Sequence, residues 1–194
     1  MVDGISILLG GFPWMNDWMN DRMNDCSVSL DYARNRVQRC VSPRKLAMST
    51  SPLRFDDLEV GLTSRSGPYP VTREEIIGFS SRWDPRPLHL DDGAAEASEF
   101  GGLIAPAAFT LCVCVLLATS ETPATAAVAG LGMDRVRWPQ PVRPGDRLRQ
   151  ETRITALRPS RSLPDRGIVR GDRTVWDDER GVVMTAEVTW MVER

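Results

Sequence analysis

A long apolar run between Gly101 and Thr119 sets the strictest limit on how this chain can fold. Residues 103–118 carry no charged side chain and lack the helical alternation of apolar and polar residues that marks a surface helix. A helix of this kind must be enclosed on most sides by other elements. Pro106 fits in its first turn, where a missing N–H costs no hydrogen bond. The run therefore predicts a core helix wrapped by a sheet.

A membrane span is the alternative for the same run, which is near the lower limit of roughly 17 residues for crossing a bilayer. Glu99 and Glu121 flank the run, Pro106 lies within it, and neither end carries lysine or arginine. These features favour a core helix, so we expect no membrane partner.

Four segments after the run have the character of β-strands: residues 128–138, 147–157, 167–177 and 182–192. Turn-rich breaks separate them, and the last break is a plain hairpin turn at residues 177–181. Successive strands after one buried helix predict an α+β arrangement, in which a curved antiparallel sheet surrounds that helix.

Three elements are expected before the run. Residues 55–62 predict a short strand. Thr72 and Glu75 stand at capping-box spacing and predict the start of a helix that leads to Trp83. Acidic and alanine-rich sequence at residues 91–98 predicts a second short helix.

Residues 1–50 differ in character from the rest of the chain. A four-residue repeat containing Met-Asn-Asp runs from Trp14 to Asp25 and is typical of low-complexity sequence without a packed partner. Met48 directly precedes the first segment that has the character of folded protein. We expect a folded domain over residues 53–194 and a poorly structured extension over residues 1–50, which is either disordered or a start-site artefact.

Charge and cysteine content argue against several functions. The net charge is −2, which gives no electrostatic case for binding nucleic acid. The four cysteines form no Cys-x-x-Cys pair and the chain has one histidine, so we expect no metal site. Cys112 and Cys114 lie in the apolar run and are interpreted as small buried hydrophobic residues. This use of cysteine fits a reducing, cytoplasmic location.

The loop at residues 84–89, Asp-Pro-Arg-Pro-Leu-His, is the candidate for acid–base chemistry. Its His89 is the only histidine in the chain, and a histidine can both take and give a proton near neutral pH. The Asp84 carboxylate can share a water molecule with it. The two prolines restrict the backbone between these groups, which lowers the cost of holding them in working geometry. The alternative is a stiff turn that carries a surface histidine.

Three motifs in order resemble those of the MaoC-like acyl dehydratases, a hotdog-fold family that includes the (R)-specific enoyl-CoA hydratases. The loop at 84–89 resembles the family motif Asp-x-Asn-Pro-Leu-His. Residues 100–105 (Phe-Gly-Gly-Leu-Ile-Ala) resemble the lead into the family's central helix, and residues 141–146 (Pro-Val-Arg-Pro-Gly-Asp) resemble the turn before its next strand. The resemblance covers residues 53–194 and implies a single hotdog domain.

The resemblance also implies a site and a reaction. Asp84 and His89 would act as base and acid on the water that is added to, or removed from, an acyl thioester of coenzyme A or of a carrier protein. The backbone N–H of Ala107 would stabilise the thioester enolate at the start of the central helix. No separate cofactor is implied, because coenzyme A is part of the substrate. A single hotdog domain leaves a sheet edge and part of the helix exposed, so we expect a homodimer with the site near its interface.

Two departures from the family pattern leave other functions open. Arg86 replaces the motif asparagine, and Ala107, preceded by Pro106, replaces a glycine. The hydratase or dehydratase reaction therefore competes with thioester hydrolysis on the same fold and with a non-catalytic acyl-thioester-binding subunit. Arginines between Arg143 and Arg170 are candidates for binding coenzyme A phosphates, with solvated strand-edge charge as the alternative.

Overall fold

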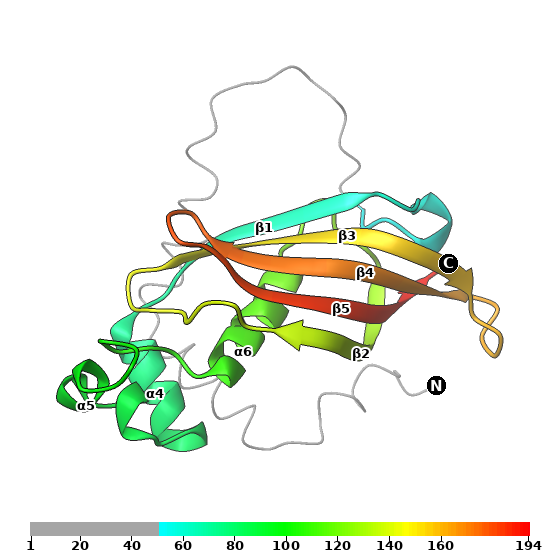
Figure 1. The fold of residues 1–194 in the computed structure, drawn as a ribbon. Coiled ribbons are helices and arrows are strands. Elements are labelled where there is room, and N and C mark those ends of the chain that lie inside the picture. The colour runs from blue at the N-terminus through cyan, green and yellow to red at the C-terminus, as the bar shows by residue number, and fades with distance from the viewer. Residues whose placement is uncertain (1–50) are drawn as a thin grey trace. The chain divides into compact units, whose positions relative to one another are not determined.

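A five-stranded antiparallel sheet in the order β1-β3-β4-β5-β2 forms the main layer of the computed structural model (Figure 1). The strands are β1 (Thr63–Pro70), β2 (Ala127–Arg137), β3 (Arg147–Pro159), β4 (Arg166–Asp177) and β5 (Gly181–Glu193). The four strands predicted after the apolar run are all present, each close to its predicted bounds. Since β1 and β2 each pair on one side, they are the two edges of the sheet.

The structure describes residues 51–194. The predicted extension over residues 1–50 and the predicted start at Met48 lie outside this part of the chain. Within residues 51–194, no helix combines the length and the apolar character needed to cross a membrane.

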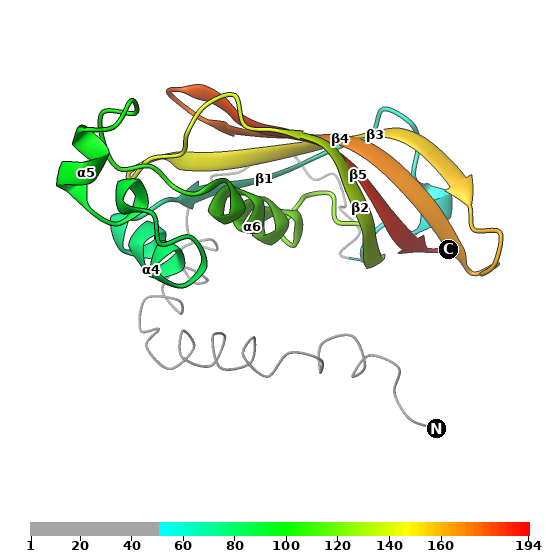
Figure 2. The ribbon, with the colours of Figure 1, turned by 60° about the horizontal axis from the view of Figure 1, so that its bottom comes forward.

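The predicted core helix is α6 (Ala107–Ala118), which lies along one face of the curved sheet (Figure 2). Phe109, Val113 and Leu117 recur every four residues on its buried side. They belong to one apolar cluster with side chains of the central strands, among them Leu148, Val175 and Met184. Complete burial of a side chain of this size stabilises the folded state by roughly 1.5–3 kcal/mol. A helix packed against a curved antiparallel sheet confirms the predicted α+β hotdog architecture.

One face of α6 is exposed, as expected for a single hotdog domain. Val115 is 53% exposed and Leu116 is 51% exposed. Cys114 is buried as expected, but Cys112 is exposed, so the prediction for Cys112 was wrong. One sheet can cover only one side of a helix, and the run has no charged residue that would mark the other side.

Three helical elements lie between β1 and α6: α4 (Arg73–Trp83), η2 (Pro87–His89) and α5 (Asp92–Glu96). Thr72 caps α4 as predicted, because its hydroxyl accepts from the Glu75 N–H at 3.2 Å while the Glu75 carboxylate accepts from the Thr72 N–H at 3.4 Å. Phe79 on α4 meets Phe109 on α6 edge to face, with ring centroids 5.6 Å apart. This contact places the loop that follows α4 beside the first turns of α6.

The strand predicted at residues 55–62 is wrong, because this stretch begins with the 3₁₀-helix η1 (Phe55–Asp57) and β1 starts only at Thr63. Phe55 and Leu58 are three residues apart and are both buried in a second apolar cluster. That spacing suits a 3₁₀ turn, in which residues three apart share a side. The ring of Phe55 lies on Gly167 of β4, where an added Cβ would come within 1.9 Å of it.

Glu121, which follows α6, is the centre of a mostly buried polar network. Its carboxylate accepts a hydrogen bond from Ser64 at 2.8 Å, from Gln150 at 2.7 Å and from the Thr152 hydroxyl. The guanidinium of Arg173 lies 3.6 Å from the same carboxylate. The network joins β1, β3 and β4 beneath the last turn of α6. Charges in such a place are tolerated only when each has its partner.

Replacing Glu121 by glutamine is expected to lower the free energy of unfolding by about 3–5 kcal/mol, because Arg173 would stay buried without a charged partner. Urea unfolding followed by circular dichroism measures this loss. The matched control Glu151→Gln breaks an exposed pair with Arg65 and is expected to cost less than about 1 kcal/mol. Equal losses in the two variants would contradict the buried network.

Candidate active site

Short backbone hydrogen bonds fix the loop that follows α4. The Asp84 N–H donates to the Ser80 carbonyl at 2.9 Å and ends α4. The Arg86 N–H donates back to the Asp84 carbonyl at 2.8 Å, and the His89 N–H donates to the Arg86 carbonyl at 3.0 Å. Pro87 begins η2, where its missing N–H costs nothing. The predicted stiff connection between Asp84 and His89 is therefore a folded turn.

The turn brings Asp84 and His89 together. His89 Nε2 lies 3.6 Å from Asp84 Oδ2, and the two side chains are 2% and 25% exposed. The imidazole is thus enclosed, while the carboxylate reaches the surface. The alternative of a surface histidine is wrong because this ring is buried.

Arg86 joins the two groups in a way that the sequence analysis missed. Its Nε and Nη2 atoms donate to the two carboxylate oxygens of Asp84, each at 2.7 Å. The same Nη2 atom is 3.0 Å from His89 Nε2. The hydrogen bonds from Arg86 lower the pKa of Asp84 below its usual value, and this effect outweighs the partial burial, which acts in the opposite sense. The two-residue separation from Asp84 was the one feature of the sequence that pointed to this ion pair.

The partners of His89 define its tautomer. A guanidinium can only donate, so His89 Nε2 accepts from Arg86 and carries no proton. His89 Nδ1 lies 2.8 Å from the Ile104 carbonyl and must donate to it. The ring is therefore a neutral imidazole. The lone pair of its Nε2 atom faces the Arg86 guanidinium, next to the Asp84 carboxylate. The Ile104 carbonyl is a backbone group, which no residue type in the sequence could have revealed.

Ala107 begins α6 three residues after Ile104. Pro106 is the N-cap of the helix, and its carbonyl accepts from Phe109 at 3.0 Å and Thr110 at 3.3 Å. Ala107 is exposed, and its N–H has no acceptor among the described residues. A free N–H at a helix start favours a negative charge. The structure thus places the predicted oxyanion donor on the segment that also holds His89.

The turn at residues 141–146 supports this segment. The Ala105 N–H donates to the Val142 carbonyl at 2.8 Å, and the Arg143 guanidinium donates to the Phe100 carbonyl. Asp146 closes the turn by accepting from the Arg143 N–H at 2.8 Å. Burial raises the pKa of the Asp146 carboxyl. The third motif therefore serves the site indirectly, by fixing the lead into α6.

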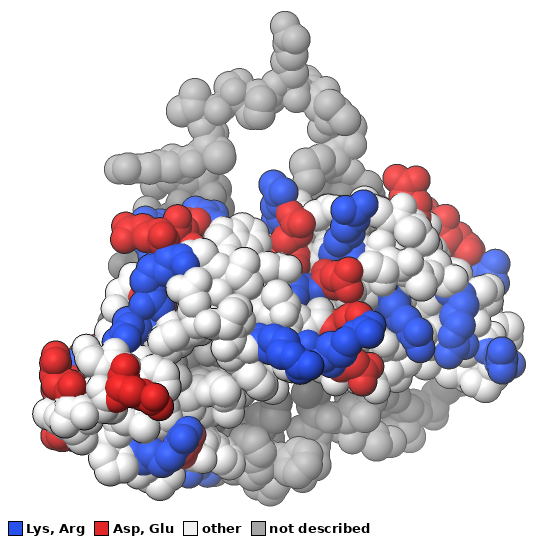
Figure 3. Space-filling view, in the orientation of Figure 1, with Lys and Arg blue, Asp and Glu red and all other residues white. Residues whose placement is uncertain are grey.

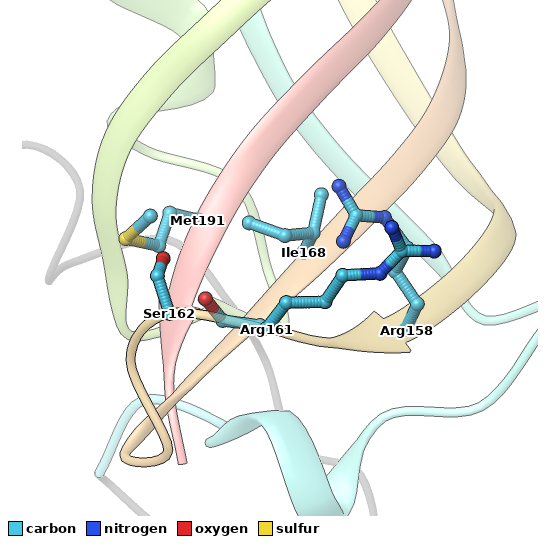
Figure 4. A pocket seen from close by; sticks show the side chains of 6 residues that line it. Arg158, Arg161, Ser162, Ile168 and Met191 are labelled. Atoms are coloured by element: carbon cyan, nitrogen blue, oxygen red, sulfur yellow. The ribbon is translucent and has the colours of Figure 1, made fainter.

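Two cavities lie apart from Asp84, His89 and Ala107. The larger, of about 410 Å³, is at the β3–β4 hairpin, and Figure 4 shows Arg158 and Arg161 extending over it. Neither arginine pairs with a carboxylate within residues 51–194. They fall in the set expected to bind coenzyme A phosphates, which stays a prediction. The smaller cavity, of about 140 Å³, is lined by residues that include Arg65 and Trp176.

Charge is mixed over the face of the sheet that Figure 3 shows, where positive and negative side chains lie side by side on the strands. Several of them form surface ion pairs, such as Arg65 with Glu151 and Arg149 with Asp178. In the described part of the chain, no three His, Cys, Asp or Glu side chains gather where they could hold a metal ion.

Comparison with known proteins gives consistent matches. The family model for the MaoC like domain matches residues 61–168, which is more than half of the chain. A MaoC-like dehydratase from Rhodospirillum rubrum has 37% sequence identity and a TM-score of 0.68, with 73% of this chain and 97% of that chain covered.

Two further matches have lower sequence identity. The (R)-hydratase PhaJ1 from Pseudomonas aeruginosa, in its unliganded form, has 22% identity and a TM-score of 0.62, covering 74% of this chain and 87% of that chain. The uncharacterized protein YdeM of Bacillus subtilis (strain 168) is 23% identical over 143 residues, which is 73% of this chain and all of YdeM. The hotdog architecture, the loop at 84–89 and the match over residues 61–168 together show that the chain belongs to the MaoC-like dehydratase family.

Proposed function

We propose that this protein is a hydro-lyase that reversibly adds water to a trans-2-enoyl thioester and forms an (R)-3-hydroxyacyl thioester. One observation carries the proposal: the Asp84 carboxylate and the unprotonated Nε2 of His89 lie 3.6 Å apart, on a turn bonded to the lead into α6. The R. rubrum relative is named a MaoC-like dehydratase, which supports the same reaction class. The thioester is that of coenzyme A or of a carrier protein, and no separate cofactor is needed.

The two side chains supply the proton transfers. Both are acceptors in the resting state, so a water between them can donate one hydrogen to each. The water oxygen forms a bond to C3 of the enoyl group while one of its protons moves to the Asp84–His89 pair. That proton then passes to C2, so the complete water molecule is added across the double bond. Dehydration follows the same steps in reverse.

The thioester oxygen becomes negative as the bond to C3 forms. The free N–H of Ala107, at the positive end of the α6 dipole, is the group we assign to that oxygen. A methyl group in place of the family glycine leaves this N–H intact. Because backbone donors are fixed before the reaction, they stabilise the enolate without reorganisation.

A homodimer is the assembly that we propose. β2 is an edge strand and exposes Val128 and Leu131, while α6 exposes Val115 and Leu116. A second copy that pairs along β2 would satisfy its open backbone groups and cover apolar side chains. The free thiols of Cys112 and Cys114 fit the reducing conditions of a cytoplasmic protein, the location that we propose.

The variants Asp84→Asn and His89→Ala are each expected to lower kcat/KM by roughly 10²–10⁴, the usual contribution of positioned acid–base groups. Loss of enoyl absorbance, measured on enoyl-CoA esters of varied length and branching, follows the reaction. Asp178→Asn removes a carboxylate that pairs with Arg149 on the surface, and this control is expected to keep full activity.

Full activity in both site variants would contradict the assignment. Release of free thiol in place of enoyl loss would identify thioester hydrolysis. Saturable binding without turnover would identify the acyl-thioester-binding subunit, which the position of Arg86 between the two groups makes a specific alternative.

The ionisation of Asp84 is expected to report its ion pair with Arg86. Arg86 lowers the pKa of the Asp84 carboxyl, so this group is expected to take up a proton only below the ordinary range of an aspartate. In Arg86→Asn this transition is expected to move to higher pH. The ¹³C NMR shift of the Asp84 carboxyl carbon, followed against pH, measures the transition. A transition at the same pH in both proteins would contradict the ion pair.

Leu131→Glu is expected to shift the protein from dimer to monomer, because it places a charge among the apolar side chains of the edge strand. Multi-angle light scattering after gel filtration measures the mass. Leu163→Glu is the matched control, since Leu163 is 45% exposed against 50% for Leu131 but lies on the β3–β4 loop. A monomeric wild-type protein, or equal effects of both variants, would contradict the proposed interface.

A further inference from the structure

The guanidinium of Arg86 occupies the point where the reacting water is needed. Its Nη2 atom is 2.7 Å from Asp84 Oδ2 and 3.0 Å from His89 Nε2. These are hydrogen-bond distances to both groups at once, which is the condition for a water that bridges them. We call this point the bridging position. Because Asp84 Oδ2 and His89 Nε2 are 3.6 Å apart, the bridging position holds one nitrogen or oxygen atom at a time.

We propose that Arg86 excludes water from the bridging position in the unliganded protein, and that its side chain must withdraw before the reaction can begin. The expected effect on turnover rests on the proposed hydratase function. The exclusion itself is a property of the free protein and can be tested without any substrate. Arg86 is thus a positioning residue that regulates access to the site.

The Arg86 side chain can withdraw because it reaches solvent. It is 60% exposed, and its side-chain partners within residues 51–194 are Asp84 and His89 alone. Its two hydrogen bonds to Asp84 stabilise the closed position, but at the surface water can replace the guanidinium as the donor to that carboxylate. The flanking prolines hold the backbone, so rotation of the Arg86 side chain is sufficient to empty the bridging position.

The rest of the site does not depend on Arg86. The Asp84 N–H is held by the Ser80 carbonyl, and His89 Nδ1 is held by the Ile104 carbonyl. Asp84 and His89 therefore keep their places when the guanidinium leaves. Removal of the Arg86 side chain by mutation is expected to open the bridging position without dispersing the two acceptors.

The direct test uses diethyl pyrocarbonate, which acylates the unprotonated nitrogen of an imidazole. His89 is the only histidine of the chain, so the absorbance of the modified imidazole reports this site alone. In Arg86→Asn the modification is expected to be roughly tenfold faster or more, the factor that one hydrogen bond to a charged group contributes. The control Arg82→Asn removes a neighbouring arginine that lies over the Trp83 ring, and is expected to react like the wild type.

An unchanged modification rate in Arg86→Asn, with thermal unfolding confirming that the variant is folded, would overturn the proposal. In turnover, Arg86→Asn is expected to raise kcat/KM about three- to tenfold near neutral pH. In the wild type only the minor fraction of molecules with a withdrawn Arg86 side chain can react, whereas the variant has no such restriction. A fall in kcat/KM would also overturn it, because Arg86 would then assist the reaction. Absence of turnover in both proteins would refute the hydratase function, while the modification rates would still decide the inference.

Discussion

Burial of one side of α6 against the curved sheet is the constraint on which the rest of this structure depends. The helix has no charged residue, so it is stable in water only where the sheet covers it. The strands that cover it are joined in sequence order from β3 to β5, which lets neighbouring segments of the chain form most of the sheet. Once α6 is fixed, its N-terminus and the elements that reach it are fixed as well.

The candidate site is assembled at that N-terminus by three separate stretches of chain. Phe79 anchors α4 to α6, so the turn at 84–89 begins in the right place. The turn at 141–146 holds the lead into α6 through the Ala105 N–H. Three local features meet there: a C-cap aspartate, a buried imidazole and an exposed N–H. The fold supplies the positions of the groups to which we assign the proposed reaction.

Much of the fold could be predicted because its elements carry distinct local patterns. The strand segments separated by turn-rich breaks, and the capping box of Thr72 and Glu75, depend on short-range sequence and were confirmed. The stretch around Phe55 was misassigned because Leu58, Val60 and Leu62 alternate along the sequence as strand residues do. In the structure, the buried pair is Phe55 and Leu58, which are three residues apart. An exposed side of α6 was expected, but the residues that form it could not be identified, because Val115 and Leu116 are as apolar as the buried residues beside them.

Residues of the candidate site could be selected from the sequence, but their arrangement could not. Asp84 and His89 stood out as residue types at a fixed spacing within a proline-restricted loop. The bridging role of Arg86 depends on a side-chain conformation, and the Ile104 carbonyl belongs to the backbone, so neither has a sequence pattern. The Glu121 network unites residues of three strands, which local sequence cannot relate.

The hydrogen bond from His89 to the Ile104 carbonyl limits which changes of sequence length the candidate site can tolerate. The same four residues, 104 to 107, orient the imidazole at one end and present the amide of Ala107 at the other. Any insertion or deletion there would move the imidazole and the amide together. Substitutions in the sheet or on the exposed side of α6 leave this four-residue link unchanged, so those surfaces can vary one side chain at a time.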